Sequence, residues 1–437
     1  MAEIRPFRGI RYDTALAGPL DKVLAPPYDV ISPAQHRKLL DSSPYNIVRV
    51  ELTTPAPSDT PQDNTYTRAA AVYDSWLKKG VLAQDKEPSL YMVRHQFPYR
   101  GATARRRELT VALKLEDLAS GVVRPHEATG RGAKEDRMAL MRAAKASVSP
   151  IMLLYSDASG NIGAALDRLE RQAPTARAHA LQEEDFSLWA TSDKSLVSAV
   201  QAALRGKPVY IADGHHRYET SVEYLARGLQ DGTVTPADEA ARYVLATLMD
   251  KEDPGVMSLP YNRILKNLTP EEKQRLRPAL NTLFTQEDLS LDTSTLDAVG
   301  RRLETRPDSV MAVIGLDKGK ASILSSRPDA LRKTMPGRSD AWRSIAPCIF
   351  AEAVLPQALG LTQPEAEAKD KVDYFHEADD TVRTALAGGA VAFLLKAVPL
   401  TSLMAVADAG ERFPRKSTYF YPKLPTGLVL KSLQGGL

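Results

Sequence analysis

Hydrophobic and polar positions follow both extended and helical spacings along this chain. Two extended segments, Leu90–Phe97 and Glu108–Leu115, flank a turn at Pro98–Gly101, and this pattern predicts an antiparallel hairpin. The short apolar run Ile151–Tyr155 predicts a buried strand. Because strand-like and helical segments do not alternate regularly, we do not expect a purely parallel sheet.

Start and stop signals mark several helices. Ser32–Gln35 reads as a capping box with proline at the first helical position, which predicts a helix running to about Leu40. A second helix is expected over Tyr66–Lys79, and Gly80 ends it. Thr269–Glu272 opens a further helix by the same capping pattern.

The rest of the chain continues this mixture. Lys134–Ala146 has helical spacing, Pro208–Ile211 is a strand candidate and Tyr218–Ala226 again has helical spacing. Val310–Gly315 and Ala321–Ser325 are expected to form a second hairpin. The pattern therefore predicts an α+β protein with mixed or antiparallel sheets and flanking helices. We place a domain boundary near residue 265, which gives the regions 1–265 and 266–437.

Composition and charge narrow the classes of function. The chain has 437 residues, of which 43% are hydrophobic and 25% charged, and its net charge is +3. Such a balance gives no electrostatic reason to expect nucleic acid or a membrane surface as the main partner.

The most apolar stretch, 388–407, is interrupted by Lys396 and Pro399 and is expected to be buried sheet and turn. Cys348 is the only cysteine, and Met1–Pro6 lacks the apolar core of a signal peptide, so we expect a cytoplasmic protein.

The densest polar cluster is Asp213-Gly214-His215-His216-Arg217, which follows an apolar strand and precedes a helix. We expect these residues to form the strand-to-helix turn, where Gly214 permits a left-handed backbone. The first amides of a helix are unpaired and attract an anion such as a phosphate. His216 and Arg217 would add donors, and Asp213 could hold a magnesium ion. Alternatively, Asp213 simply caps the helix.

A second cluster combines Arg124–Thr129 with the charged run Lys134–Arg137, and contains His126 and Glu127. A carboxylate in a loop, as expected for Glu127, could accept the proton of a substrate hydroxyl. A charged flank of the following helix is the alternative interpretation. The stiff loop Ala25–Val30 could form a pocket wall or could equally be a rigid surface connection. From this loop and the second cluster together we infer five possible pocket residues: Tyr28, Asp29, Lys134, Asp136 and Arg137.

The third cluster lies near the C-terminus, in Pro414–Lys423. Lys416, Ser417 and Thr418 can all donate hydrogen bonds to the oxygens of a carboxylate or phosphate. The alternative is an exposed basic tail. Three consecutive aromatic residues, Tyr419–Tyr421, and the two bounding prolines favour an ordered segment packed on the body of the protein.

Together, these clusters resemble the domain of unknown function 1015 family of bacteria and archaea. The resemblance rests on Ile4–Gly9, the Ala25–Val30 loop, the Pro125–Arg137 block, Asp213–Tyr218 and Lys416–Leu424. The family itself implies no activity.

A more distant resemblance does imply an activity. Pro-His-Glu at 125–127, Asp-Gly-His-His-Arg at 213–217 and Lys-Ser-Thr at 416–418 follow the same order as similar motifs of free serine kinases. That resemblance implies a ParB/sulfiredoxin-like catalytic core in region 1–265, an additional α/β domain whose tail completes the site, and phosphorylation of L-serine from ATP or ADP with Mg²⁺.

Carried over to this sequence, the resemblance implies a role for each motif. Glu127, with His126 beside it, would be the general base on the serine hydroxyl. Asp213 would hold magnesium, and Gly214, His215, His216 and Arg217 would hold the nucleotide phosphates. Lys416, Ser417 and Thr418 would bind the substrate or product. Such a set fits phosphoryl transfer, in which positioning and charge neutralisation provide most of the catalysis.

Three other interpretations stay open at this stage. A nucleotide-binding switch or DNA-associated ParB-like module would need a basic recognition surface. A metal-dependent hydrolase would use His126, Asp213, His215 and His216 as ligands. A scaffold without catalytic activity is the third. The sequence determines neither the phosphoryl donor nor the acceptor. It also leaves the oligomeric state open, with a homo-oligomer among the alternatives.

Overall fold

The central strands of the first part of the chain bury side chains on both faces. In β4 (Leu90–Tyr99), Leu90 and Met92 belong to one hydrophobic core, whereas Tyr91 and Val93 belong to another. Because successive side chains of a strand point to opposite faces, the sheet that contains β4 is covered on both sides. The fold is seen in a computed structural model that describes residues 2–181, 183–290 and 295–437.

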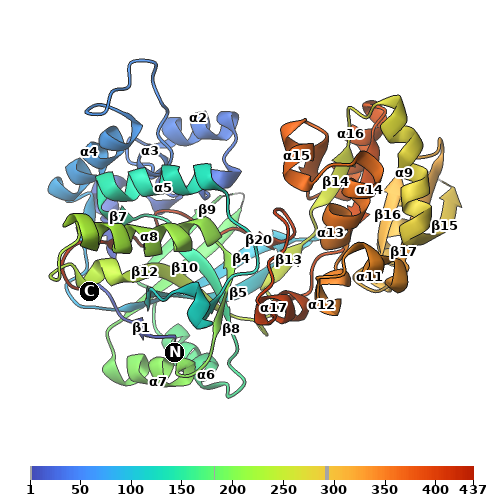
Figure 1. The fold of residues 1–437 in the computed structure, drawn as a ribbon. Helices are drawn as coiled ribbons and strands as arrows, with labels where there is room; N and C mark the ends of the chain where they lie inside the picture. The colour runs from blue at the N-terminus through green and yellow to red at the C-terminus, as the bar shows by residue number, and fades with distance from the viewer. Residues whose placement is uncertain (1, 182, 291–294) are drawn as a thin grey trace. The chain divides into compact units, whose positions relative to one another are not determined.

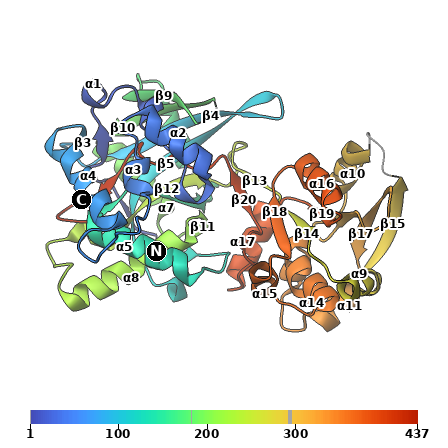
Figure 2. The same cartoon turned by 90° about the horizontal axis from the view of Figure 1, so that it is seen from above.

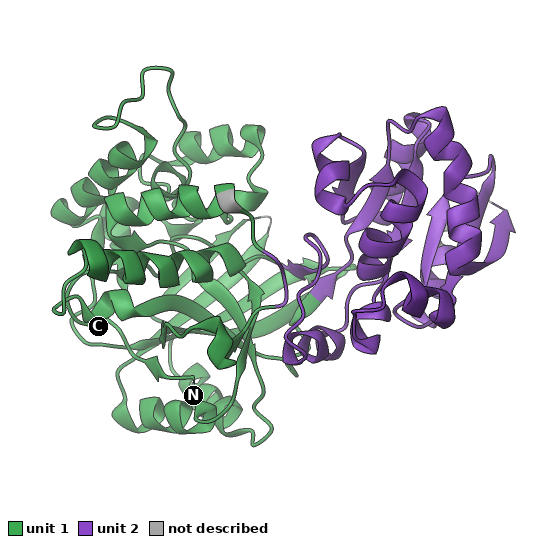
Figure 3. Ribbon diagram, viewed as in Figure 1, with its two compact units in different colours: residues 1–125, 129–257, 422–437 green, residues 126–128, 258–421 purple. Residues whose placement is uncertain are grey.

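The described residues fall into two compact units (Figure 3). Unit 1 comprises Met1–Pro125, Thr129–Met257 and Pro422–Leu437, and unit 2 comprises His126–Ala128 and Ser258–Tyr421. The C-terminal segment of the chain thus returns to the unit in which the chain began.

Unit 1 is built around a mixed sheet of order β6-β11-β8-β12-β5-β4-β10-β9, with β1 paired to β5. The β6–β11 and β8–β12 pairs are parallel, and the other neighbours are antiparallel. Its strands other than β4 are β1 (Ile4–Arg5), β5 (Ala102–Lys114), β6 (Val123–Arg124), β8 (Ile151–Tyr155), β9 (Ala176–Ala180), β10 (Glu184–Thr191), β11 (Val209–Asp213) and β12 (Tyr243–Asp250). Two smaller ribbons pair β2 (Ile10–Tyr12) with β3 (Leu82–Gln84) and β7 (Ala146–Ser147) with β21 (Lys431–Ser432).

Helices cover both faces of this sheet. The helices of unit 1 are α1 (Thr14–Ala17), α2 (Pro33–Ser42), α3 (Val48–Glu51), α4 (Thr65–Lys78), α5 (Arg131–Ala144), α6 (Asn161–Glu170), α7 (Lys194–Leu204) and α8 (His215–Asp231), with short 3₁₀ turns η1 (Leu20–Lys22), η2 (Tyr28–Val30), η3 (Leu118–Ser120) and η4 (Glu239–Arg242). Helices α3 and α4 pack on the core that contains Tyr91, and α6 and α7 on the core that contains Met92. Helices α5 and α8 run side by side (Figures 1 and 2) and share buried Met138, Met141 and Tyr224.

Unit 2 contains an antiparallel sheet of order β15-β17-β16-β19-β14-β18. Its strands are β14 (Asn262–Leu265), β15 (Phe284–Ser290), β16 (Met311–Ile314), β17 (Lys320–Ser326), β18 (Val372–Phe375) and β19 (Val391–Leu395), and the chain enters and leaves this unit through the short strands β13 (Met257–Leu259) and β20 (Tyr419–Tyr421). The helices are α9 (Pro270–Leu283), α10 (Thr295–Glu304), α11 (Pro328–Thr334), α12 (Asp340–Arg343), α13 (Ala346–Ile349), the π-helical η5 (Phe350–Val354), α14 (Leu355–Leu359), α15 (Gln363–Ala368), α16 (Ala378–Ala387) and α17 (Leu400–Asp408).

The predicted fold class is confirmed, since mixed and antiparallel sheets carry flanking helices. The capping boxes at Ser32 and Thr269 are present, and both expected hairpins form, as β4–β5 and β16–β17. None of the helices among the described residues has the length and apolar character needed to cross a membrane.

Several element boundaries differ from the sequence prediction. Strand β5 begins at Ala102 rather than Glu108, and β4 continues through Pro98 to Tyr99, so the turn is confined to Arg100 and Gly101. Helix α8 begins at His215 rather than Tyr218, because Gly214 alone makes the turn after β11. Helix α5 begins at Arg131, three residues before the expected start. The 388–407 stretch contains β19, as expected, but continues as helix α17, which starts directly after Pro399. Proline is well tolerated immediately before a helix, so here it marks a helix start rather than only a turn.

A buried lysine on β21 makes the stability of unit 1 depend on pH. Lys431 is 1% exposed, and its Nζ donates to the carbonyl oxygens of Ala240 and Ser432 at 2.5 and 3.0 Å. Burial lowers the pKa of Lys431 to about 7. Above that pKa the unfolded chain binds a proton at this residue that the folded chain does not, so the stability of the wild-type protein rises with pH from about 7 to about 10.5.

Burial of Lys431 reduces the unfolding free energy of the wild-type protein more strongly as the pH falls from about 10.5 to about 7. We expect Lys431→Met to remove this pH-dependent loss. The difference in unfolding free energy between the variant and the wild type should change by about 1.4 kcal/mol per pH unit between pH 7 and 10.5, and should be constant at lower pH. Denaturant unfolding over this range measures it. The exposed Lys86→Met variant is the control, and a Lys431→Met difference as flat as that of the control would contradict the assignment.

Candidate functional site

The turn between β11 and α8 places a carboxylate next to the start of a long helix. Asp213 is the last residue of β11, and Gly214 caps α8 with φ +90° and without a side-chain hydrogen bond to the helix. The pairing of β11 with β8 shifts register between Ile211 and Asp213. A bulge of this kind re-aims a side chain at the end of a strand. The first amides of α8 and the Asp213 carboxylate therefore meet at one turn, as the sequence predicted.

Gly214 is required at this turn for two physical reasons. A positive φ of this size is strained for residues with a side chain. In addition, a Cβ atom at this position would lie 2.9 Å from Ile151 Cγ2 and 3.1 Å from Arg217 Nε. The guanidinium of Arg217 thus packs directly against the backbone of the turn.

The carboxylate of Asp213 is held between two cations. Its Oδ2 accepts a hydrogen bond from Arg217 Nη2 at 2.8 Å, and its Oδ1 accepts one from Lys423 Nζ. Burial by itself would raise the pKa of Asp213, but the charges of Lys423 and Arg217 outweigh it and hold this pKa well below its ordinary value. Asp213 is therefore a carboxylate at neutral pH.

The neighbouring polar residues of the cluster are also fixed. Arg217 Nη1 donates to the carbonyl oxygen of Pro150. The backbone N–H of Gly130 donates to His216 Nε2 at 2.7 Å, so a neutral His216 carries its proton on Nδ1. His215 is buried, with 7% of its surface exposed. The Arg217 guanidinium and the His216 ring are thus held in place at the first turn of α8.

Residues of the second predicted cluster contact α8 as well. Lys134 Nζ lies 3.2 Å from Glu219 Oε2, and the hydroxyl of Thr129 donates to the same oxygen at 2.5 Å. Glu219 lies one turn beyond His216 on the same helix. The Thr129–Lys134 segment is therefore anchored to α8, as one continuous site requires.

Predicted pocket residues from the Ala25–Val30 loop meet Arg137 of α5. The guanidinium carbon of Arg137 lies 4.1 Å from the ring centre of Tyr28, and Asp136 Oδ2 accepts from Arg137 Nε and Nη2 at 2.8 and 2.6 Å. Asp29 Oδ2 lies 3.9 Å from Lys423 Nζ. Tyr28 and Asp136 therefore both contact Arg137, while Asp29, the neighbour of Tyr28 in sequence, lies near Lys423, which pairs with Asp213.

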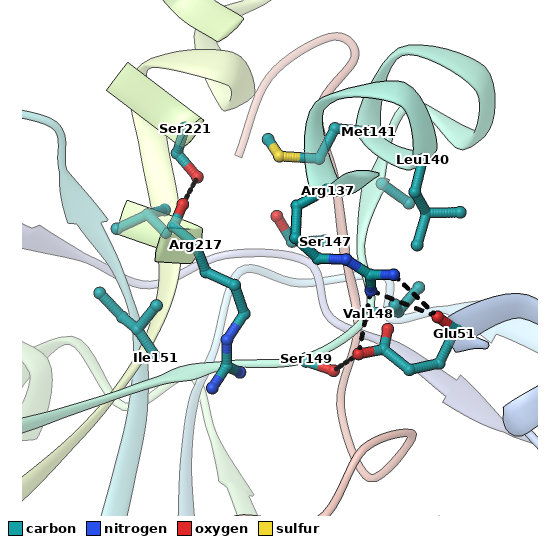
Figure 4. Close-up of a pocket in the computed structure, with 12 residues that line it drawn as sticks. Glu51, Arg137, Leu140, Met141, Ser147, Val148, Ser149, Ile151, Arg217 and Ser221 are labelled. Atoms are coloured by element: carbon teal, nitrogen blue, oxygen red, sulfur yellow. Dashed lines mark hydrogen bonds and ion pairs between the residues drawn. The ribbon is translucent and has the colours of Figure 1, made fainter. Parts of the chain in front are cut away.

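A cavity of about 40 Å³ opens beside these residues in unit 1. Arg137 and Arg217 line it together with Glu51, the last residue of α3 (Figure 4). Glu51 is 2% exposed and pairs with Arg137 at 3.4 Å. Nothing in the local sequence distinguishes Glu51 from a surface glutamate at the end of a helix, so its burial beside Arg137 could not be predicted.

The remaining predicted residues lie in unit 2 and are described there by themselves. His126 Nε2 lies 2.9 Å from Thr418 Oγ1, and Glu127 forms a parallel bridge with Phe413. The hydroxyl of Ser417, which is 1% exposed, donates to the carbonyl oxygen of Pro414 at 2.6 Å. The structure thus brings the Pro-His-Glu motif and the Lys-Ser-Thr motif into contact.

Lys416 has a different environment. Its backbone adopts φ +60°, its Nζ lies 5.4 Å from the ring centre of Tyr261, and its carbonyl oxygen accepts from buried Arg263 at 2.6 Å. The C-terminal motif is therefore an ordered part of the fold, as the bounding prolines and aromatic residues indicated.

A buried charge network supports the segment that carries Lys423. His95 is completely buried, and its Nδ1 and Nε2 lie 2.9 Å from Glu108 and 2.8 Å from Glu184. Arg106 donates from Nε to Glu108 at 2.7 Å and from Nη2 to the carbonyl oxygen of Pro422 at 2.8 Å. Arg106 therefore fixes the residue immediately before Lys423.

The two carboxylates of this network respond differently to burial. For Glu108, burial would raise the pKa, but Arg106 and His95 lower it overall. For Glu184, burial prevails over His95 and raises the pKa. The sequence carries no signal for this network, because its members come from three separate strands.

No group of three or more His, Cys, Asp and Glu side chains within residues 2–181, 183–290 and 295–437 is arranged to hold a metal ion. One carboxylate such as Asp213 nevertheless suits magnesium, which commonly binds through one or two carboxylates plus substrate phosphates.

A model of the family described as "Protein of unknown function (DUF1015)" matches residues 4–344. The chain belongs to this family. The matched range contains Glu127 and the Asp213–Arg217 turn, while Lys416–Thr418 and Lys423 lie beyond it. No curated protein matches the sequence of this family member.

Solved structures show distant similarity. A variant of a free serine kinase in complex with ADP is 14% identical, with 68% of this chain and 84% of that chain covered and a TM-score of 0.34. A conserved hypothetical protein from Pyrococcus furiosus is 16% identical, with 71% and 92% covered and a TM-score of 0.34. SbnI with a C-terminal truncation, from Staphylococcus aureus, is 11% identical, with 75% and 87% covered and a TM-score of 0.37.

Replacing Gly214 tests the geometry of the turn. We expect Gly214→Ala to lower the unfolding free energy by about 1–3 kcal/mol, because the left-handed backbone is strained for alanine. Gly130→Ala is the matched control, since Gly130 has φ −101° and its Cβ would meet its nearest neighbour, His216 Nε2, at 3.8 Å. Denaturant unfolding compares the two variants. Equal losses would show that the turn does not need glycine.

Asp213→Asn tests the charge at the turn. Because the pKa of Asp213 is lowered on folding, its carboxylate stabilises the folded state above pH 3.8, and this contribution is lost as the pH falls below that value. We expect the destabilisation caused by Asp213→Asn to be constant between pH 5 and 8 and to shrink below about pH 4. The exposed Asp74→Asn serves as control in unfolding experiments from pH 3 to 8. A destabilisation that does not shrink in acid would contradict the assignment.

Proposed function

We propose that this protein is a nucleotide-dependent phosphotransferase that acts on the hydroxyl group of a small compound, with free L-serine as the favoured acceptor and ATP or ADP as the donor. The observation that carries the proposal is the Asp213 turn. There, an ionised carboxylate and two cations stand beside the first backbone amides of α8. Phosphates of a nucleotide need this combination of donors and positive charge.

Each group at the turn has a role in the proposal. The amides of Gly214 and His215 and the side chains of His216 and Arg217 bind phosphate oxygens. Asp213 would hold Mg²⁺, and the ion would supply positive charge that neutralises the phosphates. The lowered pKa of Asp213 supports this role, because only the carboxylate binds a metal ion.

The acceptor side of the proposal rests on unit 2. Glu127, adjacent to His126, accepts the proton of the substrate hydroxyl while the hydroxyl oxygen attacks the terminal phosphorus of the nucleotide. The bond between that phosphorus and the nucleotide oxygen breaks, and the shortened nucleotide leaves. Lys416 and Thr418 donate to the substrate, and Ser417 holds the segment through Pro414. The contact between His126 and Thr418 supports a shared role for the two motifs.

Glu127→Gln tests the proposal directly. Purified full-length protein is incubated with Mg²⁺, ATP or ADP and a panel of small hydroxy amino acids and hydroxy acids, and phosphorylated products are measured by mass spectrometry. We expect phosphoserine, and a loss of at least about 100-fold in its rate in Glu127→Gln, because general base catalysis contributes about this much. Nucleotide affinity should be unchanged in this variant.

The control is Glu135→Gln, which changes an exposed glutamate at the start of α5. Phosphorylation of a different acceptor would keep the reaction class and replace serine. Nucleotide binding without any phosphorylated acceptor would reject the kinase and favour a nucleotide-binding switch.

A further inference from the structure

One oxygen of a buried carboxylate has no hydrogen-bond partner. Oε1 of Glu51 accepts from the hydroxyl of Ser149 at 2.7 Å, and among the described residues Oε2 accepts from none. Glu51 is 2% exposed. An unsatisfied buried acceptor costs about 1–3 kcal/mol, and more when it is charged. A group that donates to Oε2 would therefore be bound favourably.

Glu51 lines a cavity that can hold such a group. The cavity measures about 40 Å³, which is room for about three water-sized groups. Its wall includes Ser147 and Ser149 of the β7–β8 region and the apolar side chains Leu140, Met141 and Val148 (Figure 4). An ammonium group with one or two attached atoms fits this volume, whereas a nucleotide base does not.

Arg137 and Arg217 differ in how many hydrogen bonds their guanidinium groups already donate to the protein. Arg137 donates from Nε and Nη2 to Asp136 and from Nη1 and Nη2 to the carbonyl oxygen of Glu51. Arg217 donates one hydrogen bond from each terminal nitrogen, to Pro150 and to Asp213. Because a guanidinium has five N–H groups, Arg217 retains N–H groups for a ligand carboxylate in addition to the phosphate oxygen that the proposed function assigns to it.

The balance of charge selects the class of ligand. A small anion alone would face the Glu51 carboxylate, and a bare metal ion would face Arg137 and Arg217 with a single carboxylate to bind it. A zwitterion meets both demands, since its ammonium can donate to Glu51 and its carboxylate can accept from Arg217. Burial raises the pKa of Glu51 although Arg137 opposes this shift, and a cation next to Oε2 would counteract it further.

We propose that this cavity binds the α-ammonium group of a small free amino acid, with Glu51 Oε2 as the acceptor and Arg217 facing the carboxylate of the ligand. The inference rests on the proposed function in taking the acceptor to be an amino acid, and it assigns to Glu51 the selection of amino acids over hydroxy acids. The apolar wall restricts the ligand to a short side chain.

Binding to the full-length chain tests this site independently of phosphoryl transfer. Calorimetric titrations compare L-alanine with L-lactate and L-serine with L-glycerate, pairs of the same configuration in which a hydroxyl replaces the ammonium group. We expect each amino acid to bind at least about ten-fold more tightly than its partner, because a buried charged hydrogen bond contributes that much. Equal affinities within a pair, or no binding of either amino acid, would overturn the proposal without any variant.

Glu51→Gln then tests the residue. We expect the preference for the ammonium ligands to fall below about three-fold in this variant, and to be unchanged in the exposed Glu87→Gln control. Folding of each variant is checked by thermal unfolding, and a full preference retained in folded Glu51→Gln would overturn the assignment. Alanine has no hydroxyl, so its selective binding supports this site even if no acceptor is phosphorylated. Conversely, if serine is phosphorylated but amino acids bind no more tightly than the matching hydroxy acids, this site is rejected and the proposed kinase activity is retained.

Discussion

The Asp213 carboxylate between Arg217 and Lys423 is the interaction on which the arrangement of the candidate site in unit 1 depends. The Asp213 and Lys423 side chains are only 19% and 10% exposed, so either charge would be costly without its partner. The ion pairs orient Arg217 across the turn, and Arg217 in turn packs on Gly214 and reaches the carbonyl oxygen of Pro150. The turn is therefore held by charge on one side and by steric contact on the other.

Lys423 reaches Asp213 only because the end of the chain is itself fixed inside unit 1. Arg106 donates to the carbonyl oxygen of Pro422 and to Glu108, and the His95 ring lies between Glu108 and Glu184. Each buried carboxylate of this network therefore has a hydrogen-bonding partner. A buried charge with such partners is far less costly than an isolated one. This network supports a segment of the candidate site without taking part in the chemistry that we propose.

The sequence predicted the local elements well and the contacts between distant elements poorly. The capping boxes at Ser32 and Thr269 and the turn of the β4–β5 hairpin act over a few residues, so their effect is visible in the sequence. The start of α8 was placed three residues late, because His215–Arg217 look like loop residues until their burial and backbone are known. Lys423 was noticed in a basic segment, but its pairing with Asp213 depends on how the chain returns to unit 1. Glu51 and His95 gave no signal at all, since a buried charge looks the same in sequence as an exposed one.

The sequence by itself determined the α+β class, most of the helices and strands, and the polar motifs at 125–127, 213–217 and 416–418. It could do so because capping, hydrophobic period and glycine at a left-handed turn are properties of neighbouring residues. Tertiary structure decided which charges are buried, which partners neutralise them and where a cavity is left between them. Those outcomes depend on residues such as Asp213 and Lys423, which lie 210 positions apart, and on the loss of water around them, which makes each unpaired charge costly enough to fix its neighbours.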